Sequence, residues 1–235
     1  RGIVISAEGD KIIVLSYYDF DIYYSHNAGS TWSYYSVSTA NDEFTQIAAN
    51  HDLSIAVAGT EYSSTSTDSD SGRLFISTDF GVSFTALPEI DGSRYYWWDA
   101  IDMSYDGRVI VVGSDYSDSS SSYPDSSGYL YRSTDYGESF SHVPTSDNSP
   151  KEWNAVKVSG DGNKLFAAES GVSLYRSYLN VDSNITTTSP LEVVEIKENL
   201  TSSSTAYLAL AMSNDSRIAA LGIYGENIYV SYYNQ

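Results

Sequence analysis

The segment Ser133-Thr134-Asp135-Tyr136-Gly137-Glu138-Ser139-Phe140 decides the fold of this chain. The same spacing of Ser, Asp or Asn, Gly, hydroxyl residue and aromatic residue recurs at 25–32 and 77–84. An Asp or Asn side chain accepts N–H bonds within its own turn and Gly allows a positive φ, so each segment predicts a tight hairpin turn. We expect the final aromatic residue to anchor the next strand between two sheets. The motif residues are Ser25, Asn27, Gly29, Trp32, Ser77, Asp79, Gly81, Phe84, Ser133, Asp135, Gly137 and Phe140.

Two further patterns recur in the same register along the whole chain. A four-residue pattern consists of an aliphatic residue, usually an aromatic residue, a variable residue and Ser. It occurs five times, at 22–25, 74–77, 130–133, 174–177 and 228–231. A polar turn with an acidic residue also occurs five times, at positions 8, 52, 106, 161 and 215. Each of these turns precedes a short apolar run, which favours a buried strand over a helix. The runs are 12–15, 55–58, 109–112, 165–168 and 218–221.

The fourth and fifth copies depart from the motif. The fourth, Ser177-Tyr178-Leu179-Asn180, lacks both the acidic residue and the Gly, and the fifth stops at Gln235. An aromatic residue precedes each new unit, and in this register that of the first unit would lie before Arg1. Both ends therefore cut the repeat, and we expect one outer strand and its link, roughly 16 residues, between the end and the beginning. The aromatic residues are Phe44, Trp98, Trp153 and Tyr207.

The motif resembles the Asp-box, or BNR, repeat of sialidase-like β-propellers, and the resemblance covers nearly the whole chain at the level of the repeat. Four-stranded units of about 40 to 50 residues are typical of propeller blades. We therefore predict an all-β fold, a single β-propeller domain over residues 1–235 with about five four-stranded antiparallel blades. The first strand of each blade should line the central channel, and the last blade should lack its outer strand within this chain. The predicted blades are 1–41, 42–95, 96–150, 151–204 and 205–235.

Composition restricts the partners. Lys and Arg total 12 against 31 Asp and Glu, and the formal net charge of −19 opposes binding to nucleic acid. Without cysteine, neither a disulfide nor a thiolate metal site can form. No apolar run is long enough to span a bilayer, so we expect no membrane insertion. The start at Arg1 without a signal-like segment predicts a mature or excised chain, and the abundance of Tyr and scarcity of Lys are typical of an extracellular or cell-surface protein.

The family resemblance implies a specific test for catalysis. A sialidase-like site would need three arginines around the substrate carboxylate, a Tyr nucleophile paired with Glu, and an acidic general acid/base. Regular repeat positions indicate structural roles for the pairs Arg132 and Arg176, and Arg108 and Arg217. The N-terminal Phe/Tyr-Arg-Ile-Pro motif of that family is absent. We therefore predict no enzymatic activity. His26, His51 and His142 lie in separate predicted blades and are interpreted as solvated side chains.

Three sets of residues are weaker candidates for binding or modification. The cluster Arg94, Tyr95, Tyr96 and Trp97 could stack on sugar rings or dock a protein, or serve blade packing. Two Ser/Asp-rich loops, 63–71 and 114–127, are either solvated insertions or Ca²⁺ sites. The candidate Ca²⁺ ligands are Asp68, Asp70, Asp115, Asp118 and Asp125. No other cofactor is expected. Sequons allow N-glycosylation at Asn184, Asn199 and Asn214, in a number that chance alone would give.

The sequence favours a non-catalytic extracellular scaffold or interaction module. It could be a subunit or domain of a larger surface or filamentous assembly, with a protein partner or neighbouring subunit at the open edge of the last blade. The alternative is a carbohydrate-binding propeller that uses the aromatic cluster 94–97 to bind glycans. A glycosidase of the sialidase type is the least favoured hypothesis.

Overall fold

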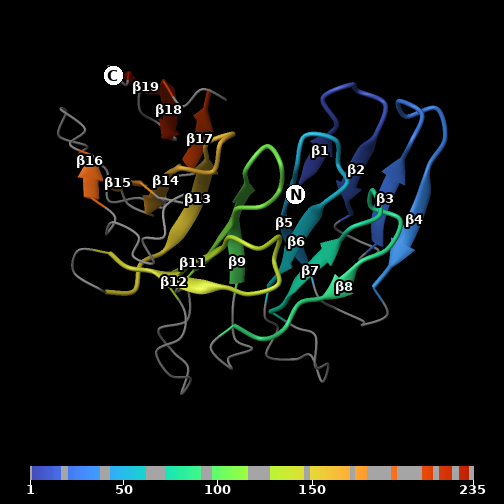
Figure 1. Ribbon diagram of the computed structural model, residues 1–235, viewed down its shortest axis with the longest axis horizontal. Helices are drawn as coiled ribbons and strands as arrows, with labels where there is room; N and C mark the ends of the chain where they lie inside the picture. The colour runs from blue at the N-terminus through green and yellow to red at the C-terminus, as the bar shows by residue number, and fades with distance from the viewer. Residues whose placement is uncertain are drawn as a thin grey trace.

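The protein was analysed as a computed structural model, in which the strands form five antiparallel sheets (Figure 1). Every regular element in the described part of the chain is a β-strand, and no helix there is long and apolar enough to cross a bilayer. The structure describes residues 2–16, 21–37, 43–61, 72–90, 97–115, 128–145, 149–169, 173–178, 192–194, 208–213, 217–223 and 228–232.

Each sheet is built from strands that are consecutive in the chain, so each sheet is one blade. Blade one contains β1 (Ile3–Ile5), β2 (Ile12–Leu15), β3 (Asp21–Ser25) and β4 (Ser33–Ser36). Blade two contains β5 (Phe44–Ala49), β6 (Ala56–Thr60), β7 (Leu74–Ser77) and β8 (Thr85–Ala86). Blade three contains β9 (Trp97–Met103), β10 (Ile110–Asp115), β11 (Leu130–Ser133) and β12 (Ser141–Val143). Blade four contains β13 (Trp153–Val158), β14 (Lys164–Glu169), β15 (Ser173–Tyr178) and β16 (Glu192–Val194). Blade five contains β17 (Leu208–Met212), β18 (Ile218–Ile223) and β19 (Ile228–Tyr232).

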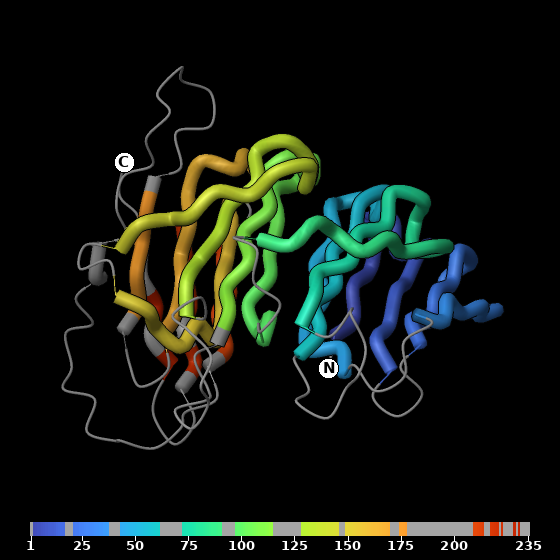
Figure 2. Tube along the Cα trace, turned by 90° about the horizontal axis from the view of Figure 1, so that it is seen from below, coloured from blue at the N-terminus to red at the C-terminus, as the bar shows by residue number. Residues whose placement is uncertain are grey.

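The blades stand side by side in an open arc (Figures 1 and 2). The first strands are innermost, because β1 packs on β5, β5 on β9, β9 on β13 and β13 on β17. This arrangement confirms the predicted propeller of about five blades and the three-stranded last blade. Blades one and five lie at opposite ends of the arc in both views, so the expectation that one outer strand and its link would join them is wrong.

Apolar cores lie between successive blades. Ile13 and Ile22 of blade one, for example, share a core with Phe44, Ile47 and Phe75 of blade two. Strand residues alternate between the two faces of a sheet, and a blade with neighbours on both sides needs apolar side chains on both faces. All residues of the central strand β6 are accordingly buried. The cores between blades therefore stabilise the arc.

The aromatic residues that begin each repeat are fixed at a β-bulge. Strand register shifts just after Phe44, Trp98 and Trp153, so one residue is skipped in each ladder. The indole Nε1 of Trp98 donates to the carbonyl oxygen of Gly72 in the preceding blade, at 2.9 Å. A bulge re-aims a side chain, and here it turns a large ring into the junction between blades.

Candidate functional site

The motif turns at 25–32, 77–84 and 133–140, called box turns below, close on themselves. In blade two, the Ser77 hydroxyl donates to Asp79 Oδ1 at 2.9 Å, and the Gly81 N–H donates to Ser77 Oγ at 2.9 Å. The other end of the turn binds the same carboxylate, since Ser83 donates its main-chain N–H to Oδ1 at 2.9 Å and its hydroxyl to Oδ2 at 2.6 Å. The same four bonds form in blade three. In blade one Asn27 replaces Asp, and its amide Nδ2 donates to Thr31 Oγ1 at 2.8 Å, the reverse of the Ser–Asp bond. These polar groups hold the turn together, which is a structural role.

The hydrogen bonds of the box turns also lower the pKa of the Asp side chains that accept them. Partial burial opposes ionisation of Asp79, but the hydrogen bonds from Ser83 and Ser77 outweigh it and lower the pKa of Asp79. The same balance, with Ser139 and Ser133 as donors, lowers the pKa of Asp135. A carboxyl group whose pKa is lower in the folded state stabilises the fold above its unfolded pKa of about 3.9. That stabilisation is lost as the pH falls through the folded pKa.

Asp79→Asn combined with Asp135→Asn should therefore change the pH dependence of stability. We expect the double variant to be less stable than the wild type at about pH 7, and the difference to shrink as the pH falls through the lowered pKa values of the two carboxyl groups. Urea unfolding at a series of pH values measures this difference. The reciprocal variant Asn27→Asp should steepen the loss of stability in acid. Unchanged pH profiles for both variants would show that the box carboxylates do not stabilise the fold.

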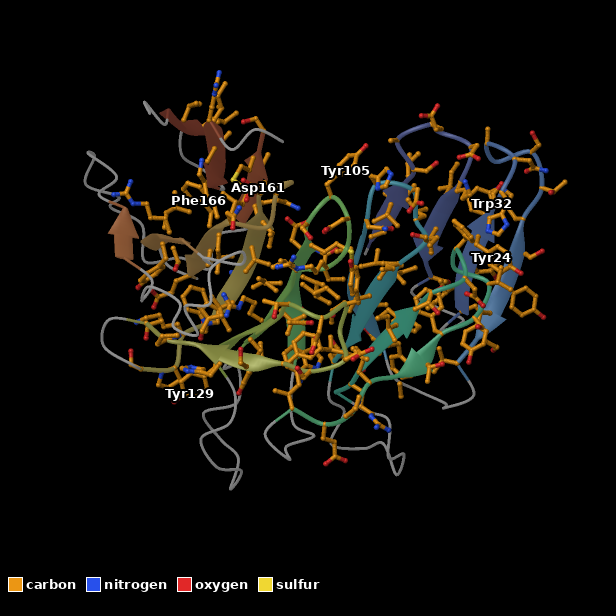
Figure 3. The ribbon with its side chains drawn as sticks, viewed as in Figure 1. Tyr24, Trp32, Tyr105, Tyr129, Asp161 and Phe166 are labelled. Atoms are coloured by element: carbon orange, nitrogen blue, oxygen red, sulfur yellow. The ribbon has the colours of Figure 1, made fainter. Side chains whose placement is uncertain are left out.

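The final aromatic residue of the box turn does not always anchor between sheets. Phe84 is buried against blade one and Phe140 packs partly buried against the core of blades two and three. Trp32 is 45% exposed, and its indole donates only to Gly29 of its own turn (Figure 3). The expectation is thus wrong for Trp32, because no blade covers that side of blade one in the described part of the chain.

A residue other than Gly also adopts a positive φ in each box turn. Ala28, Phe80 and Tyr136 have φ values of 55°, 62° and 61°. Such a backbone is uncommon for a bulky residue, and sequence analysis predicted it only for Gly. Phe80 reaches blade one, where its carbonyl oxygen lies 2.8 Å from His26 Nε2. His26 is exposed, as expected, but it also links two blades.

The turns between first and second strands, called inner turns below, form a ladder across the blades. The N–H of Ala7 donates to the carbonyl oxygen of His51 at 2.7 Å, that of His51 to Tyr105 at 3.1 Å, and that of Tyr105 to Gly160 at 3.0 Å. The ring centroids of His51 and Tyr105 are 4.1 Å apart, and the two rings stack. The inner turns of blades one, two and three therefore each donate one main-chain hydrogen bond to the inner turn of the next blade.

The acidic residues of the inner turns act locally. Asp106 and Asp161 accept the hydroxyl of the Ser two residues earlier, at 2.6 and 2.5 Å. In blade one this acceptor is Asp10, at 2.8 Å from Ser6 Oγ, whereas the acidic residue at the repeat position is Glu8. The chain closes the same turn with an acidic residue at either place.

A partly buried ion pair between two inner strands was not predicted from the sequence. Lys157 Nζ lies 3.0 Å from Asp102 Oδ1, and the N–H of Val158 donates to Asp102 Oδ2 at 2.7 Å. Burial raises the pKa of Asp102, against the opposing attraction of Lys157. Asp102 and Lys157 occupy the same position of successive repeats, where blades one and two have the apolar residues Val4 and Ala48. These two opposite charges were the signal in the sequence for an ion pair.

Most of the weaker candidates lie outside the described residues. Trp97 is the first residue of β9, where it pairs with Asp115 and is partly buried, and the side chain of Asp115 is not among those described. Within the described ranges, no three His, Asp or Glu side chains gather in a way that could hold a metal ion. The calcium, glycan and glycosylation assignments stay predictions. The residues outside the described ranges are Asp68, Asp70, Arg94, Tyr95, Tyr96, Asp118, Asp125, Asn184, Asn199 and Asn214.

The outer edge of blade five has no fourth strand among the described residues, as the repeat register predicted. In the other four blades a fourth strand pairs with the third strand. In blade five, β19 pairs with β18, and no fourth strand pairs with it among the described residues. Ile228 and Val230 of β19 are also exposed. This strand offers both unpaired backbone and apolar side chains.

Comparison with known proteins supports the fold. No protein-family model matches this chain, and no curated protein does. It is similar to the structure of YCF48 bound to D1 peptide, with a TM-score of 0.61 and 13% identity over 98% of this chain. It is also similar to the Cps50 (Swd1) β-propeller domain of Myceliophteria thermophila, with a TM-score of 0.62 and 11% identity over 98% of this chain. The chain spans 63% of the length of the YCF48 chain and 68% of the Cps50 chain. These likenesses show that the chain has a β-propeller fold.

Proposed function

We propose that this chain is a non-catalytic scaffold that binds a protein partner along the open edge of blade five. One observation carries the proposal: β19 (Ile228–Tyr232) occupies the position that β3, β7, β11 and β15 hold in the other blades, yet no fourth strand pairs with it in the described part of the chain. An exposed strand edge is a template for an added strand, in which main-chain hydrogen bonds supply affinity and alternate side chains supply specificity.

The chemistry of the chain defines the partner. An extended segment paired with β19 would place alternate side chains beside Ile228 and Val230, so apolar residues at every second position fit best. The net charge of −19 favours a basic segment over an acidic one. The similar propeller YCF48 was solved with a bound peptide, which supports peptide binding as a use of this fold. The low Lys content supports an extracellular or surface location, as part of a larger assembly.

A synthetic copy of the chain's own outer strand provides the test. The segment Glu138–Thr145 contains β12, the outer strand of blade three. We expect this peptide to bind the full chain saturably in isothermal titration calorimetry and to slow hydrogen–deuterium exchange in Ile228–Tyr232. A scrambled peptide of the same composition is the control. Equal binding of both peptides, or no added protection of β19, would refute the proposal.

Two competing functions have their own readouts. Trp97 is partly buried at the start of β9, and an indole ring can stack on a sugar. Carbohydrate binding would appear as a glycan-array signal that Trp97→Ala abolishes. Glycosidase activity would appear as release of the fluorophore from a sialoside substrate. Either result, without protection of β19, would replace the scaffold proposal.

A further inference from the structure

Each internal blade packs against two neighbouring blades through opposite faces of its sheet. Ile47 and Phe75 of blade two point towards the preceding blade, where they meet Ile13 and Ile22. Val57 of the same blade points towards the following blade and belongs to the next core. We call these the preceding face and the following face. The repeat register identifies the equivalent residues in every blade.

The preceding face of blade one is uncovered. Ile3 is 59% exposed, whereas its repeat equivalents in the other blades are only 3 to 8% exposed. Tyr23 is likewise only partly buried, whereas its equivalents Phe75, Tyr131 and Tyr175 are buried. The equivalents of Ile3 are Ile47, Ile101, Val156 and Leu210.

The uncovered residues form one continuous row. Strand pairing places Ile3 opposite Val14, Val14 opposite Tyr23, and Tyr23 opposite Tyr34. Directly opposed residues of antiparallel strands lie on the same face, so this apolar row crosses the whole blade. Trp32 extends the row at the outer end. We call these residues, with Ile5, the first-blade face.

The rim of the first-blade face also holds an unused main-chain acceptor. In the ladder of inner turns, the carbonyl oxygens of His51, Tyr105 and Gly160 each accept an N–H from the preceding blade. The carbonyl oxygen of Ala7 occupies the same place in blade one, and no described residue donates to it. A docked blade would complete this ladder.

The opposite end of the arc carries the complementary face. Ile228 is 73% exposed, whereas its equivalents in blades one to four are 0 to 4% exposed. In blades one to three this aliphatic residue belongs to the core shared with the following blade. Ala209 and Val230 on blade five are exposed as well. The equivalents of Ile228 are Ile22, Leu74, Leu130 and Leu174.

We propose that the first-blade face binds the following face of blade five in a second copy of this chain. The two surfaces are the halves of the junction that is formed between every pair of successive blades in the arc, and they lie at opposite ends of one molecule (Figure 1). Two copies would therefore associate head to tail, through a heterologous interface. This association goes beyond partner binding at β19, because it uses the face of blade five and leaves the outer edge of its sheet open.

Sedimentation velocity over a range of protein concentrations tests the association. We expect the mass of the wild type to rise with concentration, and Ile3→Asp or Ile228→Asp to weaken the association by about tenfold or more, since each buries an unpaired charge. Val82→Asp is the matched control, because Val82 is an exposed apolar residue of a box turn outside both faces. Far-UV circular dichroism confirms that the variants are folded. A wild type that stays monomeric at all concentrations would overturn the proposal.

Cross-linking tests the direction of the contact. A Cβ placed on Gly2 would lie 2.6 Å from Ile47 Cγ2 in the junction of blades one and two, and the equivalent pair between copies is Ala209 and Ile3. The natural chain has no cysteine, so disulfides can form only at introduced sites. A mixture of Ile3→Cys and Ala209→Cys chains should give a mixed disulfide dimer. Disulfides between two Ile3→Cys chains alone would indicate a symmetric face-to-face dimer and refute the head-to-tail contact.

Discussion

Replacing Trp153 by alanine is expected to lower the free energy of unfolding by about 3 to 5 kcal/mol. The indole is buried between blades three and four, where its ring packs at 5.2 Å against that of Tyr175. Its Nε1 donates to the carbonyl oxygen of Gly128 at 3.1 Å. The substitution opens a cavity between blades and removes one of the two hydrogen bonds that the Gly128 carbonyl oxygen accepts; the bond from the Lys151 N–H, at 2.7 Å, remains. The cavity therefore accounts for most of the expected loss.

Trp32 provides the matched control for this substitution. Its indole also donates to a glycine carbonyl, that of Gly29 at 3.0 Å, but the side chain is 45% exposed. We therefore expect Trp32→Ala to cost about 1 kcal/mol or less. Urea unfolding should be followed at low protein concentration, so that association through blade one does not contribute. Equal losses for the two variants would show that the junction between blades three and four contributes little.

Gly81→Ala is expected to lower the free energy of unfolding by about 2 to 4 kcal/mol, the sum of two effects. The φ of Gly81 is +82°, a left-handed conformation that costs an alanine about 1 kcal/mol. The added Cβ would also lie 2.7 Å from Cδ1 and 2.9 Å from Cγ1 of Ile13 in blade one. Such overpacking typically costs about 1 to 3 kcal/mol, because the neighbouring side chain must move.

Gly9→Ala separates the two effects. Gly9 has a φ of +73°, but no atom lies within 4 Å of its added Cβ, so only the backbone cost of about 1 kcal/mol is expected. Thermal unfolding of both variants measures the difference. Ile13→Val should cost less in the Gly81→Ala background than in the wild type, because it removes the clashing Cδ1. Equal destabilisation by Gly9→Ala and Gly81→Ala would mean that the blades are not packed as described.

Local patterns were enough to predict most of the strands. The run 12–15 is β2, and 74–77 and 130–133 are β7 and β11. The box turns could be predicted because their donors and acceptors lie within a few residues of one another, as Ser77 and Asp79 do. The three-stranded sheet β17-β18-β19 of the described residues agrees with the repeat register. In each case the interaction is contained within one blade.

Features at the blade junctions could not be predicted in this way. Gly59 has no turn to explain it, but a Cβ there would lie 2.5 Å from the Cβ of Trp98 in the next blade. The Asp102–Lys157 ion pair joins residues that are 55 positions apart, and the repeat register does not show which positions touch. The shape of each junction depends on how two sheets pack, which periodicity alone does not describe.

Ile3 and Ile47 show which properties of a residue the sequence determines and which the tertiary structure determines. They are the same residue at the same repeat position, and the sequence by itself determined that both belong to the first strand of a propeller blade. Only the tertiary structure decided that Ile47 is buried and Ile3 is 59% exposed. The physical reason is that strand formation depends on neighbours within the blade, whereas burial depends on the adjacent blade. The open edge of β19 and the uncovered first-blade face are therefore the two surfaces where partners should be sought.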